Sequence, residues 1–150
     1  EYYNDQRQPD KKIGKPSWLH YHQFGLAAKD TPGFKTMSTI IKELGHVGRT
    51  VELFKIDCEG CEWKTFPGWF GDLKIRQINV ELHPQGRPTG ESLDTSANRF
   101  FKYLHQKGYV IHHKESNTYG CQGICIEYAL VLLKPGIFQD ASHCSDGKAL

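Results

Sequence analysis

Two strand-length apolar segments, each ending in acidic residues, constrain the fold of this chain most. Residues 51–57 read VELFKID, and residues 75–83 read IRQINVELH. The connection between them, residues 58–74, has room for a short helical turn, and parallel strands are joined by crossovers of this kind. We therefore expect a buried strand at 51–57 and a second strand beside it, with their acids at the same edge of one sheet.

Helical periodicity occurs at two other places. Apolar residues recur at i, i+3, i+4 and i+7 after Thr36, which can cap the helix, and before Gly45, which suits the left-handed position at its end. A second stripe of this kind lies between a cap at Asp94 or Ser96 and Gly108. The two stripes are Met37, Ile40, Ile41 and Leu44, and Ala97, Phe100, Phe101 and Leu104.

Three further segments have strand patterns: residues 18–27, 109–113 and 126–133. The resulting order is strand, helix, strand, short helix, strand, helix, strand, strand. Such alternation predicts an α/β fold with a mostly parallel sheet that helices cover on both faces. The last two strands follow each other without a helix, so we expect them to pair antiparallel.

The chain has 150 residues, which suits a single core. We expect a loop or frayed end at 1–16, the folded domain at 17–134 and a polar tail at 135–150. The formal net charge of +2 is too small to indicate a nucleic-acid partner. No apolar run reaches the roughly 20 residues of a membrane span, so this segment is not expected to contact a membrane.

Acidic and imidazole side chains follow the two neighbouring strands. Asp57 and Glu59 come after the first strand, and Glu81 and His83 end the second, while Glu62 lies at the start of the helical turn. At one edge of the sheet they could bind hydroxyl or ammonium groups, act as a general base or hold a divalent cation. The alternative is that they are solvated carboxylates at strand ends.

Cysteine spacing raises a separate possibility. Cys58 and Cys61 form a CxxC pair, and Cys121 and Cys125 form a CxxxC pair. Four thiolates could hold zinc as a structural domain, and a CxxC at a helix start could serve a thiol oxidoreductase. The long separation of the pairs argues against zinc, and the adjacent acids argue against a reactive thiolate. We expect small packed residues, or disulfides within each pair in an oxidising compartment, and no metal ligands.

The run KIDCEGCEW, followed by INVELH, a helix and two final strands, resembles the FkbM-like branch of class I methyltransferases from about residue 18 to 133. The matching positions are Ile56, Asp57, Glu59, Gly60, Glu62 and Glu81. The resemblance implies a Rossmann-like doubly wound sheet, S-adenosylmethionine as cofactor and methyl transfer to oxygen of a small-molecule or glycan-type acceptor. Transfer to a hydroxyl requires a base, for which Asp57 or His83 is the candidate. Glu59, Glu62 and Glu81 would then orient substrate or cofactor.

One departure from that family has consequences for the whole chain. No Gly-x-Gly turn, through which such enzymes approach the cofactor, follows any strand. We expect the C-terminal portion of a longer domain that does not bind S-adenosylmethionine alone, with residues 18–27 far from 51–57 and an apolar strand edge left open. A non-catalytic binding module on the same fold is the alternative.

Overall fold

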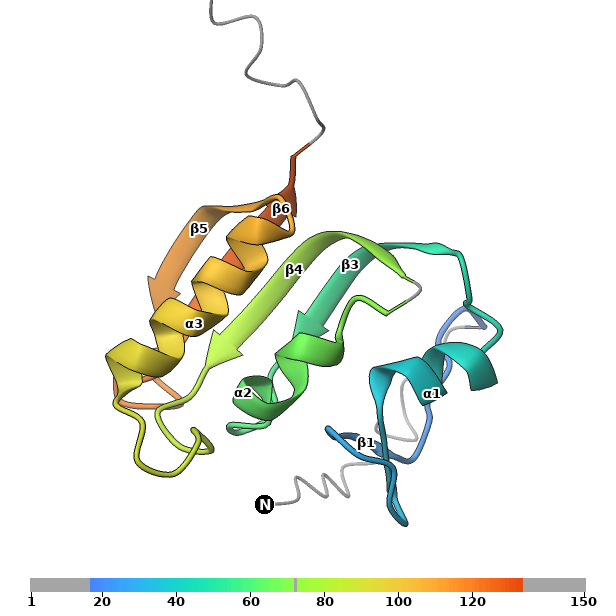
Figure 1. Cartoon of the computed structure of the whole chain (residues 1–150), viewed down its shortest axis with the longest axis horizontal. Helices are drawn as coiled ribbons and strands as arrows, with labels where there is room; N and C mark the ends of the chain where they lie inside the picture. The colour runs from blue at the N-terminus through green and yellow to red at the C-terminus, as the bar shows by residue number, and fades with distance from the viewer. Residues whose placement is uncertain (1–16, 72, 134–150) are drawn as a thin grey trace, which may run out of the picture.

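The computed structural model describes residues 17–71 and 73–133, which form two sheets and the helices that connect their strands (Figure 1). The expected end loop at 1–16 and the tail at 135–150 lie outside the described residues. One sheet has the strand order β3-β4-β6-β5, and the other pairs β1 with β2. The strands are β1 Gly25–Leu26, β2 Phe34–Lys35, β3 Thr50–Ile56, β4 Lys74–Leu82, β5 Tyr109–Ser116 and β6 Ile126–Leu132.

The larger sheet is mixed. β3 and β4 are parallel, as expected, with Ile56 opposite Val80. β6 lies between β4 and β5 and is antiparallel to both. The antiparallel pairing of the last two strands is therefore confirmed, whereas the mostly parallel sheet is wrong. The reason is that β6 returns from β5 without a helix and inserts beside β4, which makes two antiparallel pairs against one parallel pair.

The helices begin and end largely where capping residues predict. α1, Met37–Glu43, starts after Thr36, whose hydroxyl accepts a hydrogen bond from the Thr39 amide, and Gly45 follows its end with φ 65°. α3, Leu93–Gln106, is capped by Ser92, two residues before Asp94 and four before Ser96, the two expected caps. Between β3 and β4 lie the short helix α2, Glu62–Thr65, and the 3₁₀ turn η1, Phe66–Gly68.

Aromatic side chains hold the helices on the sheet. α2 and α3 lie over the same face of the larger sheet (Figure 1). Phe100 of α3 is fully buried and makes edge-to-face contacts with Trp63, Phe66 and Trp69, at ring-centroid distances of 6.0, 5.2 and 5.8 Å. This cluster fixes α2 against α3, and the same core includes Ile78 and Val80 of β4.

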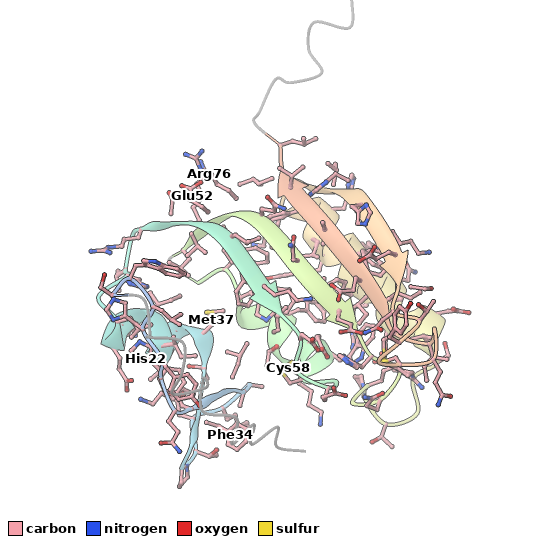
Figure 2. The ribbon with its side chains drawn as sticks, turned by 180° about the vertical axis from the view of Figure 1, so that it is seen from behind. His22, Phe34, Met37, Glu52, Cys58 and Arg76 are labelled. Carbon is pink, nitrogen blue, oxygen red and sulfur yellow. A yellow bond between two sulfur atoms is a disulfide. The ribbon has the colours of Figure 1, made fainter. Side chains whose placement is uncertain are left out.

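The other face of the sheet has no helix in front of it in the described part of the chain (Figure 2). The expectation that helices cover both faces is therefore wrong. β3 is also an edge strand, because within residues 17–71 and 73–133 it pairs only with β4. Leu53 of β3 is consequently 53% exposed, so the expected fully buried strand is half open. The open apolar edge itself agrees with the expectation.

Residues 18–27 form much less strand than their pattern predicts. Only Gly25–Leu26 is a strand, and it pairs with β2 instead of joining the sheet of β3. Trp18 and Tyr21 are 75% and 65% exposed. An alternating pattern forms a strand only where a neighbour supplies hydrogen bonds and burial, and here none of the larger sheet's strands does so. Within the described residues, no helix has the length and apolar character needed to cross a membrane.

Candidate functional site

The site lies where β3 and β4 end side by side. Ile56 is paired with Val80 in a parallel register. The next residues, Asp57 and Glu81, therefore lie side by side at the C-terminal ends of the two strands. Cys58 follows directly, at the end of β3 that faces α2 (Figure 2). The structure therefore brings together the acids that the sequence placed at two strand ends.

The turn after β3 depends on two glycines. Gly60 has φ 102°, and a Cβ there would lie 2.7 Å from the carbonyl oxygen of Gln85. A Cβ on Gly86, in the loop after β4, would lie 2.3 Å from the carbonyl oxygen of Gly60. The backbones of the two loops thus touch, which no residue with a Cβ permits without movement. This contact brings Glu59, whose own φ is 55°, beside Gln85, and Gln85 Nε2 donates to Glu59 Oε2 at 3.1 Å.

A buried carboxylate orients the histidine. His83 and Glu62 are 1% and 0% exposed, and His83 Nδ1 lies 2.9 Å from Glu62 Oε1. The same oxygen accepts the backbone N–H of Cys58 at 3.1 Å. Trp63 Nε1 donates to the carbonyl oxygen of His83 at 2.8 Å. These contacts fix both the ring and the backbone of His83.

The other nitrogen of His83 points to the exposed side of the site. Its Nε2 is 3.6 Å from Asp57 Oδ1 and 3.6 Å from Glu59 Oε2. The side chains of Asp57 and Glu59 are 44% and 45% exposed, so a ligand in solvent can reach them. Asp57, Glu59 and His83 thus form one cluster. Its two carboxylates and its imidazole could bind hydroxyl groups or a cation.

Glu81 is adjacent but enclosed. It is 3% exposed, and its Oε1 accepts a hydrogen bond from Asn117 Nδ2 at 2.9 Å. Burial raises the pKa of the Glu81 carboxyl, and the charge of Asp57 raises it further, whereas the hydrogen bond from Asn117 lowers it. The net direction is upward. Glu81 therefore contributes a carboxyl group whose ionisation is coupled to the charge of the exposed cluster.

The four cysteines in the described residues form two disulfides, Cys58–Cys61 and Cys121–Cys125. The alternative of four thiolates around one zinc ion is wrong, because each sulfur is bonded to another sulfur. Disulfides within each pair are the outcome that the spacing left open. The first disulfide closes the turn that carries Glu59. The second closes residues 121–125, and the backbone N–H of Asn117 donates to the carbonyl oxygen of Cys125 at 3.0 Å. Both therefore stabilise loops that supply the site.

Sequence reasoning missed part of this arrangement. Glu62 was predicted to orient substrate or cofactor, but its carboxylate is enclosed and contacts His83. Asn117 and Gln85 were not singled out, although each donates a hydrogen bond to one of the predicted acids. The Pro/Gly-rich loop after His83 could have indicated Gln85. The only sequence feature that could have pointed to Asn117 is the cysteine pair that follows it.

Comparison with known proteins gives one match. The family described as "Methyltransferase domain" matches residues 3–132, which is most of the chain. Neither the curated proteins nor the solved structures include a match. The match extends over the two strands, the CEGCEW turn and the loops that build the site. The chain therefore belongs to the methyltransferase domain family.

Proposed function

We propose that this chain serves an S-adenosylmethionine-dependent methyltransferase that methylates an oxygen atom. The observation that carries the proposal is the convergence of Asp57, Glu59 and His83 beyond two parallel strands in a member of a methyltransferase family. Ligands of open α/β sheets bind beyond this edge. An acceptor held there would meet two carboxylates and an imidazole, which are suitable partners for hydroxyl groups.

When bound, S-adenosylmethionine would supply an electrophilic methyl group at its sulfonium. Transfer to the acceptor oxygen would form the carbon–oxygen bond as the carbon–sulfur bond breaks, and would release S-adenosylhomocysteine with the bonding electron pair. The hydroxyl proton passes to the Asp57 carboxylate or to Nε2 of His83, the two candidate bases. In-line attack depends on positioning, which fixed groups at the end of a rigid sheet can supply.

The remaining acids have supporting roles in this proposal. Glu59 is exposed next to His83 Nε2 and would orient the acceptor or the cofactor. Glu81 is buried, so we propose that it orients substrate or cofactor indirectly, through the charge interaction of its carboxyl with Asp57. Glu62 positions His83, because its carboxylate is enclosed and holds Nδ1. Several carboxylates in one place can each accept a hydrogen bond from a hydroxyl group. They therefore favour a methyl-accepting substrate with several hydroxyls, of the small-molecule or glycan type, as the resemblance to the FkbM-like branch implies.

We also propose that the chain supplies only part of the cofactor site. The support is the absence of a Gly-x-Gly turn from the sequence and the open edge of β3. Isothermal titration of the 150-residue chain with S-adenosylmethionine is then expected to give no binding heat. Binding at micromolar concentration would contradict this part of the proposal.

Transfer itself is tested with the complete enzyme. Incorporation of a labelled methyl group from S-adenosylmethionine into polyols and glycans is compared for the unaltered protein, Asp57→Asn and the control Glu115→Gln, an exposed acid on β5. We expect Asp57→Asn to lose about 100-fold or more of the turnover. Unchanged turnover would remove Asp57 from the mechanism. Acceptor binding without any transfer would favour the non-catalytic binding module.

A further inference from the structure

Three donor atoms at the site point to one place. Oδ1 of Asp57, Oε2 of Glu59 and Nε2 of His83 lie within 4.8 Å of one another. His83 contributes its nitrogen from a ring that is 1% exposed, while both carboxylates are reached from solvent. A rigid buried ligand and two exposed carboxylates are thus directed at a common point on the surface.

The distances do not fit direct hydrogen bonds. Nε2 is 3.6 Å from each carboxylate oxygen, whereas a charged imidazole N–H donates to a carboxylate at about 2.7–2.9 Å. Two ligands bound about 2.1 Å from the same ion lie about 3.0–3.5 Å apart at octahedral or tetrahedral angles. The observed separations are therefore closer to those of ligands that share an ion.

The hydrogen bond on the other side of the ring supports this reading. An ionised Glu62 can only accept, so the contact with its Oε1 places the proton of the ring on Nδ1. The lone pair of Nε2 then faces Asp57 and Glu59. Carboxylate–histidine pairs of this kind orient metal-binding imidazoles in many proteins.

The charge of the site is unbalanced. The carboxylates of Asp57, Glu59 and Glu62 surround a single imidazole, and no lysine or arginine in the described residues forms an ion pair with any of them. Even a protonated His83 would leave an excess of negative charge. A divalent cation would neutralise it.

We propose that Asp57, Glu59 and His83 bind a divalent cation of the Mn²⁺ class. Two carboxylates favour hard ions and one imidazole favours borderline ions, and Mn²⁺ accepts both. Since both carboxylates are exposed, coordination positions remain open for water or an acceptor oxygen. The inference deepens the proposed function and rests on it for its role. With the ion bound, Asp57 and His83 would serve as ligands and not as the base. The ion would lower the pKa of a coordinated acceptor hydroxyl, and the proton would leave to solvent water beside the two exposed carboxylates.

Electron paramagnetic resonance of Mn²⁺ tests the site without cofactor or acceptor. Free Mn²⁺ gives a six-line signal that decreases on binding, and we expect one ion per 150-residue chain. Asp57→Asn and Glu59→Gln should each weaken binding at least tenfold, and Glu62→Gln by about 10–100-fold through loss of ring orientation. Glu115→Gln is the matched control, because Glu115 also lies beside a histidine, His113, at 3.4 Å, and should bind as the unaltered chain does.

Two results would overturn the inference. One is no decrease of the free Mn²⁺ signal when the unaltered chain is added. The other is that Asp57→Asn and Glu59→Gln bind Mn²⁺ as tightly as the unaltered chain. Both substitutions are at exposed side chains, and circular dichroism confirms that each variant is folded. Binding is measured without methyl transfer, so a failed transfer assay leaves a positive Mn²⁺ result standing. Absence of Mn²⁺ binding likewise leaves the methyl-transfer proposal standing, with Asp57 or His83 as base.

Discussion

Glu62 Oε1 lies 2.9 Å from Nδ1 of His83, although the two residues are 21 positions apart and on different elements. The contact joins the first turn of α2 to the end of β4. It also places a fully enclosed carboxylate behind a ring whose opposite nitrogen faces the exposed acids. Removal of this carboxylate should therefore affect both stability and the site.

Glu62→Ala should destabilise the chain. The substitution leaves the buried Nδ1 of His83 and the backbone N–H of Cys58 without their acceptor, and each unsatisfied group costs about 1–3 kcal/mol. We expect the free energy of unfolding in urea to fall by about 2–5 kcal/mol. Glu115→Ala, at an exposed position, should change it by less than about 0.5 kcal/mol. Equal effects of the two substitutions would contradict the role given to Glu62.

Gly60→Ala should disrupt the contact between the two site loops. The added Cβ would lie 2.7 Å from the Gln85 carbonyl oxygen, at a φ of 102° that side chains rarely adopt. We expect the thermal midpoint to fall further than in Gly45→Ala, a matched change where φ is also positive but nothing lies within 4 Å. A left-handed backbone alone costs a residue with a Cβ about 1–2 kcal/mol. Because φ 102° lies outside the left-handed region that Gly45 occupies, the excess measures the collision together with the less favourable backbone of Gly60. Equal thermal midpoints of Gly60→Ala and Gly45→Ala would mean that the loops after β3 and β4 can move apart without loss of stability.

The ionisation of Glu81 should make stability depend on pH. Burial raises the folded-state pKa of this carboxyl above its unfolded value of about 4.3. Its favourable contribution is therefore complete below that value and is lost as pH rises through the folded pKa. Relative to Glu81→Gln, the unaltered chain should lose stability between acid and neutral pH in urea unfolding. A difference that stays constant with pH would contradict the raised pKa, and Glu115→Gln provides the exposed-acid control.

The Cys121–Cys125 disulfide should stabilise the loop that holds Asn117 on Glu81. A loop this short gives about 2 kcal/mol on the chain-entropy account. The double variant Cys121→Ser and Cys125→Ser should lose that amount in urea unfolding, and dithiothreitol should then lower its stability only through Cys58–Cys61. If dithiothreitol lowers the stability of the double variant as much as that of the unaltered chain, the second disulfide contributes nothing.

Local patterns predicted the parts of the fold that local physics determines. Thr36 and Gly45 mark the two ends of α1, because a capping side chain and a left-handed residue each act on the backbone of a single helical turn. The neighbouring parallel strands followed from the crossover between them, and this placed Asp57 beside Glu81. The insertion of β6 between β4 and β5 could not be predicted in the same way, because it depends on pairing between distant segments.

The interior of the site was equally hard to predict. Glu62 and Glu59 both follow a cysteine in this turn, but Glu62 belongs to α2, whose next residue, Trp63, packs against Phe100. Asn117 reaches Glu81 across 36 positions of sequence. Such contacts arise from the tertiary arrangement, so the residue types alone indicated the acids and the histidine but not the groups that hold them.

The open edge of β3 has a practical consequence for handling this chain. Its unpaired backbone groups are a template for another strand, so concentrated samples have a route to edge-to-edge assembly. Glu52 and Lys55 stand on this strand and pair with Arg76 and Glu127. Because these charges are of opposite sign and are already paired within the chain, they offer little repulsion to a second copy of β3. Dilution, which acts directly on association, is therefore the condition under which the chain should stay monodisperse.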